Sequence, residues 1–251
     1  MGKIVAIGGG EIGRPGYPVE TTAIDKEIIR LTGKKNPKLL FIPTASSDSP
    51  GYVNTVREHF GKRLGCKVDV LLLIKNKLTY KEIQKKIFYS DIVYVGGGDT
   101  LTMLKVWRKY RVDKILRLAY QKNIVLSGLS AGAICWFRFG SSDLMSLGQA
   151  NTTAYTRVGG LNIIPLTVSP HHIREKHRKK ALIRIMKKTP GVGIALDDYS
   201  ALEIISDTYR IITSKPIAKV HKVYYQNKKL VYKKIKKQKQ FLPLSSIIKK
   251  D

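Results

Sequence analysis

Short apolar runs alternate with amphipathic stretches through the first half of the chain. The runs have the length of buried strands, and turn residues follow them closely. They lie at residues 3–7, 38–42, 68–74, 91–95 and 124–126. Apolar residues at helical spacing lie between them, at residues 21–31, 52–64, 80–88, 100–110 and 112–122. Strands and helices that alternate with short connections predict a parallel, doubly wound α/β sheet.

The pattern weakens after Gly140. The elements expected there are a polar loop or lid at 141–156, strands at 161–168, 192–196 and 201–205, and a basic helix at 173–188. Residues 209–236 alternate enough for antiparallel hairpin strands. We therefore expect one α/β domain over residues 1–251, with a doubly wound, mostly parallel sheet flanked by helices. Residues 209–251 would form a small antiparallel, lysine-rich hairpin and tail extension.

Glycine- or proline-bearing loops follow several of the expected strands. Three of them span residues 8–18, 43–51 and 96–100, and Ser130 follows the strand at 124–126. Ligands of open parallel sheets bind beyond the carboxyl ends of the strands. We therefore expect the three loops and Ser130 to share one crevice.

The segment around Ser130 reads Gly-Leu-Ser-Ala-Gly at 128–132, which matches the G-x-S-x-G nucleophile elbow. A nucleophilic serine on a sharp strand-to-helix turn needs small neighbours, because backbone segments approach each other closely there. The apolar segment 133–137 is helix-capable and would aim its first N–H groups at the serine. The Ala131 N–H could then stabilise an oxyanion. The alternative is a tight turn in which Ser130 only caps the helix.

The glycine-rich stretch at 8–13 contains G-x-G-x-x-G, the pattern of dinucleotide-binding loops. That fingerprint should open a helix directly and meet an acidic residue at the end of the next strand. Here Pro15 and Pro18 keep the chain in a loop, and the strand at 38–42 ends without an acid. We therefore reject a dinucleotide site.

The charge of the chain raises the hypothesis of a nucleic-acid partner. The sequence contains 46 Lys and Arg residues but only 18 Asp and Glu residues, which gives a net charge of +28. Such a balance suggests a nucleic-acid partner, but the basic residues are spread along the chain and are densest at 228–239. A solvated lysine face is the alternative, and no common nucleic-acid-binding signature is present. We expect no nucleic-acid partner beyond non-specific charge. A positive surface would also attract acidic substrates.

Nothing in the sequence indicates a membrane or an oxidising compartment. No run of 18 apolar residues occurs, and the N-terminal MGKIVAIGGG lacks the features of a secretory signal. The two cysteines are Cys66 and Cys135, and Cys135 reads as a small core residue. A cytoplasmic location, without a membrane partner, is the expectation.

A serine nucleophile needs a base, and the base needs an orienting acid. The histidines are at positions 59, 171, 172, 177 and 221. His171 follows Pro170 at the end of a strand-like run, where a base would be held rigidly, whereas His59 falls on an expected surface helix. Asp197 and Asp198 also follow a strand. The order Ser…His…Asp differs from the Ser…Asp…His order of α/β-hydrolases. The histidines match no zinc-site spacing, so we expect neither metal nor cofactor.

Four blocks taken together resemble the aspartyl dipeptidases (peptidase E) and the cyanophycinases. They read GLSAGA at 128–133, VGGGDT at 95–100, SPH at 169–171 and IALDD at 194–198. These families are serine peptidases on a flavodoxin-like, class-I glutamine-amidotransferase-like fold. The resemblance extends from residue 1 to about 215. The opening IGGGE at 7–11 is more similar to cyanophycinases, and the overall length is closer to the dipeptidases.

The resemblance implies a triad by position. Ser130 would be the nucleophile, His171 the base and Asp198 the acid. The family's acid is commonly Glu, so Asp197 remains open as the alternative. Cys occupies the elbow in the glutamine amidotransferases, and serine here argues against glutaminase activity.

The resemblance also implies the groups around the triad. The N–H groups of Ala131 and Gly98 resemble the oxyanion hole, with Gly97 in reserve. Gly97 and Asp99 are also expected to contact substrate. The dipeptidases bind the substrate aspartate with an arginine on the helix after the histidine. Arg178 falls at about that position, and Arg174 is the alternative.

The expected function is that of a serine peptidase that hydrolyses a small peptide or amide through an acyl-enzyme. The partner would be a small acidic peptide, with an aspartyl residue at the scissile bond. Two alternatives remain open: a catalytically silent protein that binds a small ligand in the same crevice, and a basic protein associated with nucleic acid. The sequence leaves the number of chains in the assembly open.

Overall fold

The computed structural model describes residues 2–143, 155–174 and 177–250, and these form two sheets. Eight strands form the larger sheet in the order β14-β11-β10-β1-β5-β4-β2-β3. Its parallel strands are β1 (Lys3–Ile7), β5 (Val125–Leu129), β4 (Ile92–Val95), β2 (Lys38–Ile42) and β3 (Lys67–Val70). Its antiparallel strands are β10 (Ser200–Ile205), β11 (Thr208–Thr213) and β14 (Leu242–Pro243). The parallel α/β sheet predicted over residues 3–137 is confirmed.

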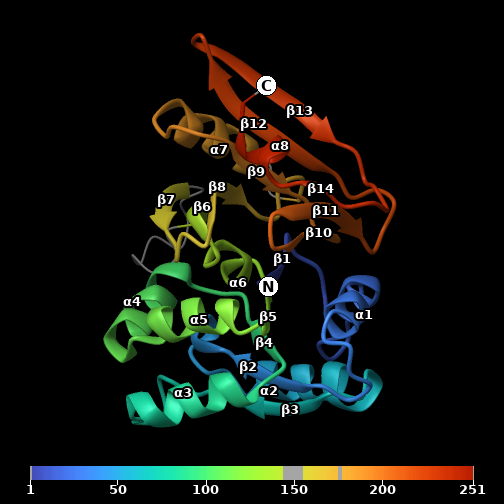
Figure 1. The fold of residues 1–251 in the computed structure, drawn as a ribbon, viewed down its shortest axis with the longest axis vertical. Helices are drawn as coiled ribbons and strands as arrows, with labels where there is room; N and C mark the ends of the chain where they lie inside the picture. The colour runs from blue at the N-terminus through green and yellow to red at the C-terminus, as the bar shows by residue number, and fades with distance from the viewer. Residues whose placement is uncertain (1, 144–154, 175–176, 251) are drawn as a thin grey trace.

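Helices cover both faces of this sheet (Figure 1). The bounds are α1 Thr22–Arg30, η1 Thr44–Ser46, α2 Pro50–Val56, the π-helical turn η2 Arg57–Arg63, α3 Tyr80–Tyr89, α4 Thr100–Tyr110, α5 Val112–Gln121 and α6 Ala131–Ile134. Alternate residues of β1 point to opposite faces. Val5 and Ile7 pack with α1 and α2, whereas Ile4 and Ala6 pack with α3 to α6. Each fully buried isoleucine contributes about 1.5–3 kcal/mol to folding.

A second sheet of six strands has the order β13-β12-β9-β8-β6-β7. The strands are β6 (Phe137–Asp143), β7 (Tyr155–Gly159), β8 (Ile164–Ser169), β9 (Gly193–Leu196), β12 (Val220–Gln226) and β13 (Lys229–Ile235). One face packs into the core cluster that α4 and α5 also enter, and α7 (Arg178–Lys187) covers the other face. Residues 209–251 thus contribute to both sheets, and the β12–β13 hairpin lies at the top of Figure 1.

The structure corrects several expected boundaries. The apolar run at 68–74 is a strand only to Val70, and further on the Asp48 carboxylate accepts from the backbone N–H groups of Ile74 and Lys75. The segment 133–137 is not a helix throughout. Helix α6 ends at Ile134, and Phe137 begins β6 by pairing with Ile164 of β8.

The polar stretch expected as a loop or lid begins inside β6, where Ser141 and Ser142 are buried. Its last residues, from Tyr155, begin β7, and residues 144–154 lie outside the described part of the chain. The basic helix begins later than predicted, at Arg178. No helix among the described residues is both long enough and apolar enough to cross a membrane.

The expectation that His59 lies on a surface helix is wrong. It is buried, and its Nε2 lies 2.8 Å from Asp25 Oδ2, which also accepts from the Thr21 hydroxyl. Burial raises the pKa of Asp25. The pair links α1 to η2 beneath the loop that follows β1, and a sequence pattern cannot show it because the partners are far apart in the chain.

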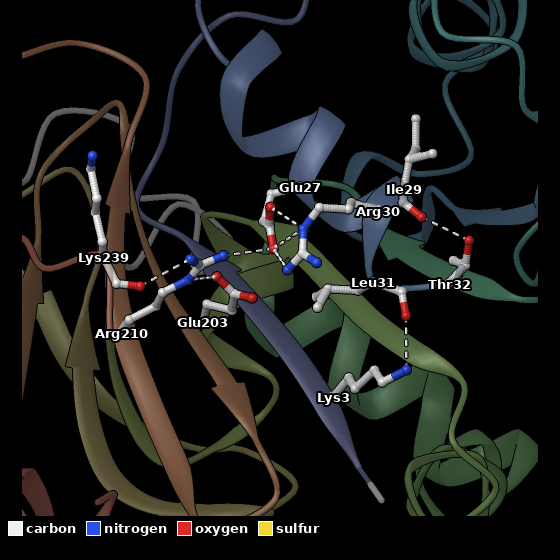
Figure 2. A network of polar contacts seen from close by, with 9 residues as sticks. All are labelled: Lys3, Glu27, Ile29, Arg30, Leu31, Thr32, Glu203, Arg210 and Lys239. Atoms are coloured by element: carbon white, nitrogen blue, oxygen red, sulfur yellow. Dashed lines mark hydrogen bonds and ion pairs between the residues drawn. The ribbon is translucent and has the colours of Figure 1, made fainter. Parts of the chain in front are cut away.

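An ion-pair network ties α1 to the antiparallel strands (Figure 2). Arg210 on β11 lies 2.6 Å from Glu203 of β10 and 2.7 Å from Glu27 of α1. Arg30 also pairs with Glu27. Glu203 is fully buried, and burial raises the pKa of its carboxyl. The network holds α1, and with it the loop between β1 and α1, against the sheet.

Candidate active site

Ser130 lies on a sharp turn between β5 and α6, as the elbow motif predicts. Its backbone φ is 57° and ψ is −114°, a conformation that costs a non-glycine residue on the order of 1–3 kcal/mol. Its N–H donates to the Ile7 carbonyl over 3.2 Å, so the end of β1 supports the turn. The serine is therefore held by the sheet and does not cap α6 with its side chain.

The glycines of the motif allow backbones to approach each other. A Cβ added at Gly128 would lie 2.6 Å from the Val95 carbonyl oxygen, and one at Gly132 would collide with the same oxygen. Any larger residue would push β5 and α6 away from β4. The spacing G-x-S-x-G thus reflects close packing on both sides of Ser130.

His171 and Asp198 form a direct pair. His171 Nδ1 lies 2.5 Å from Asp198 Oδ1. A carboxylate only accepts, so Nδ1 carries the hydrogen and Nε2 is left to take a proton. His171 follows β8 and Asp198 follows β9, and these strands are parallel neighbours. The topology thus brings together two residues that are 27 positions apart in the chain.

The glycine-rich loop after β1 packs against this pair. A Cβ added at Gly9 would collide with both His171 Nδ1 and Asp198 Oδ1. The Gly8 carbonyl accepts from the His171 N–H, and the Gly9 carbonyl accepts from the Tyr199 N–H. Gly9 therefore allows this loop to approach the histidine–aspartate pair closely, which the motif alone did not reveal.

Asp197 faces a different partner. Its Oδ2 accepts from the Lys219 N–H over 2.8 Å, and burial raises its pKa to about 6. Asp198 is therefore the acid that contacts His171. The two carboxylates diverge at the turn that follows β9, where the Ser200 N–H donates to the Asp197 carbonyl.

Gly97 and Gly98 approach Ser130 from the end of β4. The Gly97 N–H donates to the Tyr52 hydroxyl over 3.3 Å, and burial raises the pKa of Tyr52 to about 12. Gly98 has a φ of 135°, and a Cβ there would collide with the Ala45 carbonyl. The Gly97 N–H is thus engaged with Tyr52, and both glycines line the same cavity as Ser130. No motif in the sequence marks Tyr52 as a residue of this site.

Asp99, expected to contact substrate, instead has a structural role at the start of α4. Its carboxylate accepts from the N–H groups of Leu101 and Thr102 and from the Thr102 hydroxyl, which caps α4. It is absent from the described cavity lining.

A cavity of about 1140 Å³ joins these groups. Its walls include Ser130, His171, Asp198, Gly97 and Gly98, and the predicted crevice is confirmed. All three expected loops contribute, through residues 10–15 with Tyr17 and Pro18, through Ser46 with Ser49, and through the two glycines that follow β4. Within the described residues, no group of three or more His, Cys, Asp or Glu side chains could hold a metal ion.

The structure separates the two candidate specificity arginines. Arg178 is buried, donates to the Ser141 carbonyl over 2.8 Å and stacks on the Tyr155 ring, away from the described cavity lining. Arg174 lines the cavity, is exposed, and lies 3.5 Å from Asp198 Oδ2. Arg14 and Arg63 line it as well, and no local pattern marked them.

His172 is absent from the described cavity lining. Its Nε2 lies 2.5 Å from the Tyr232 hydroxyl on β13. Burial and the nearby His221, Lys179 and Arg178 lower its pKa to about 4. His172 therefore anchors the loop of His171 to the C-terminal hairpin.

Comparison with known proteins shows which family the chain belongs to. Residues 4–212 match the model of Peptidase family S51. The chain is similar to the uncharacterized peptidase YgaJ of Bacillus subtilis, with 33% identity over 89% of this chain and 92% of the relative. It is also similar to peptidase E of Pasteurella multocida, with 24% identity over 57% of this chain and 61% of that protein.

Solved structures share the fold. A peptidase from an acI-B1 actinobacterium superposes with a TM-score of 0.70, at 20% identity over 97% of both chains. A putative peptidase E protein of Listeria monocytogenes superposes with a TM-score of 0.58, at 17% identity over 94% of this chain and all of that one. The family match spans most of the chain, and the chain therefore belongs to peptidase family S51 and is a serine-type peptidase.

Proposed function

We propose that the protein hydrolyses a small peptide or amide with a triad of Ser130, His171 and Asp198. The contact between His171 and Asp198, inside the cavity that Ser130 also lines, supports it most directly. Ser130 Oγ attacks the amide carbonyl carbon while His171 Nε2 takes the hydroxyl proton. The C–N bond then breaks, and the imidazolium gives this proton to the leaving amine. Water, activated by the same histidine, hydrolyses the acyl-enzyme.

Two backbone N–H groups would stabilise the charge that develops on the carbonyl oxygen. Ala131 provides one at the start of α6, and Gly98 provides the other from the loop after β4. Fixed donors of this kind cost no reorganisation during the reaction, and removing one donor typically lowers kcat about 10²–10³-fold. The bond from Gly97 N–H to Tyr52 holds the Gly98 loop in place.

The substrate class we propose is a peptide with an acidic residue, such as aspartate, next to the scissile amide. Arg174 is the residue that would bind it, because its guanidinium is exposed at the cavity and touches Asp198 only over 3.5 Å. It can turn toward a substrate carboxylate with a bidentate fork. Arg178 is less suited, since its guanidinium is already engaged in the interior. The net charge of +28 would speed the encounter with an acidic peptide.

Covalent labelling tests the proposal. A fluorophosphonate should modify Ser130, and peptide mass mapping should locate the adduct there. Ser46 also lines the cavity, so Ser46→Ala is the matched control that should label normally, whereas Ser130→Ala should not label. A folded protein that binds a small ligand but never labels at Ser130 would support the silent binding protein instead.

A further inference from the structure

Three exposed apolar side chains line the cavity that contains Ser130. Tyr17 is 60% exposed, Ile173 56% and Ile217 70%. They come from three separate segments: the loop between β1 and α1, the turn after His171, and the turn between β11 and β12. Isolated exposed apolar residues are normal on protein surfaces, but several around one concave opening indicate a binding site.

The other large apolar side chains that are exposed in the described residues lie elsewhere. They are Ile74, Tyr80, Tyr89, Leu118, Leu230 and Leu242, and none lines the cavity. The grouping of Tyr17, Ile173 and Ile217 is therefore a property of this cavity and not of the surface as a whole.

The loop that carries Tyr17 is folded back on itself and fixed. Ile12 bridges Val19, and the Glu20 N–H donates to the Glu11 carbonyl. The Arg14 guanidinium pairs with Glu11 and lies 4.9 Å from the centre of the Tyr17 ring. The tyrosine is thus presented by an ordered hairpin-like loop.

The segments that carry Ile217 and Ile173 are also tied to neighbouring parts of the structure. On one side of Ile217, Lys215 pairs with Glu20 over 2.6 Å, and on the other the Lys219 N–H donates to Asp197. Ile173 directly follows His172, whose ring contacts the Tyr232 hydroxyl. The three side chains therefore form a defined apolar rim, which we use as the name for Tyr17, Ile173 and Ile217.

We propose that the apolar rim is a subsite for a bulky apolar side chain of the part of the peptide that leaves as the amine. This proposal rests on the serine chemistry proposed above. In an N-terminal aspartyl peptide no residue precedes the acidic one that Arg174 would bind, so the apolar group comes from a residue after the scissile bond. The cavity of about 1140 Å³ has room for it, because ligand sites for drug-sized molecules span roughly 300–1,000 Å³.

The first test is a series of dipeptides that differ only in the second residue. The value of kcat/KM should be about tenfold or more higher for Asp-Leu and Asp-Phe than for Asp-Ser, because burial of a large apolar side chain is favourable. Ile217→Ser should remove much of this preference, and since Ile217 is exposed the variant should fold. Leu118→Ser on α5, exposed but away from the cavity, is the matched control that should keep it.

A second test does not depend on the acidic residue. Phenylalaninamide and serinamide resemble the leaving amine and should slow phosphonate labelling of Ser130. Phenylalaninamide should protect at a concentration at least about tenfold lower, and Ile217→Ser should abolish the difference. Equal protection by the two amides, or equal kcat/KM for Asp-Leu and Asp-Ser, would overturn the subsite while leaving the serine chemistry intact. Failure of Ser130 to label at all overturns the proposed function, and the subsite with it.

Discussion

The backbone N–H of His171 donates to the carbonyl of Gly8 over 3.0 Å. This bond joins the loop after the first strand to the residue proposed as the base, 163 positions later in the chain (171 − 8). His171 has a φ of 51°, which is unusual for a residue with a side chain, and the bond helps to hold it there. The N-terminal loop and the Asp198 carboxylate thus together fix the position of the His171 imidazole.

Gly9→Ala should disrupt the histidine–aspartate pair. The added methyl would collide with His171 Nδ1 and Asp198 Oδ1, so one of the two side chains must move. A misplacement of about 1 Å at a reacting group can lower the rate about 10²-fold. Measurement of kcat together with circular dichroism tests it. Gly159→Ala is the control, because nothing lies within 4 Å of its added methyl, and wild-type activity in Gly9→Ala would contradict the role given to this loop.

Ser130→Ala should abolish hydrolysis with the fold intact, with a loss on the order of 10⁴-fold or more. His171→Ala should be nearly as damaging. The double variant should lose little more than either single variant, because triad members act as a unit. Steady-state kinetics on the three purified proteins tests it, and additive losses would argue against a shared mechanism.

Asp198→Asn should lower kcat on the order of 10³–10⁴-fold, since an amide that donates to Nδ1 favours the wrong imidazole tautomer. Asp197→Asn should keep most activity, because an amide oxygen can still accept from the Lys219 N–H. Comparison of the two variants under identical conditions decides between the carboxylates. A greater loss in Asp197→Asn would reverse the assignment.

Protonation of His172 should destabilise the protein in mild acid. Its pKa is about 4 in the folded protein and near 6.5 when unfolded, so the unfolded chain binds the extra proton between these values. The contribution is fully present above about pH 6.5 and is lost as the pH falls toward 4, by about 3 kcal/mol at most. Urea unfolding at pH 7.5 and pH 4.5 measures it. In His172→Gln the difference between the two pH values should shrink, and an unchanged difference would assign the effect to other groups.

Arg174→Lys should erase most of the preference for Asp-Leu over Asn-Leu, because an ammonium group cannot form the bidentate fork. We expect the ratio of the two kcat/KM values to fall about tenfold or more. Arg117→Lys, an exposed change on α5, is the matched control. Any preference for Asp-Leu that remains in Arg174→Lys should weaken at higher salt concentration, because salt screens the general positive charge of the protein. A wild-type enzyme that cleaves the two peptides equally well would reject aspartyl specificity.

Local periodicity was sufficient for the larger sheet. Buried residues repeat within each strand and helix up to about residue 130, so the sequence itself contained the parallel order and the loops at the strand ends. The elbow at Ser130 was also legible, since its small residues are adjacent in the chain. His171 and Asp198 could be selected because each follows a strand.

Contacts between distant segments decided the rest. An apolar run such as 133–137 fits a helix or a strand equally well, and only pairing with Ile164 made Phe137 the start of a second sheet. The position of Arg178 in the chain suggests a substrate-binding arginine, and only its contacts with Ser141 and Tyr155 show that it is engaged in the interior. The glycine-rich pattern at 8–13 indicates a loop of small residues, but it does not show that the side chains of His171 and Asp198 approach Gly9. A sequence determines by itself what is buried within one element, whereas the partner of a side chain depends on which elements the fold packs against it.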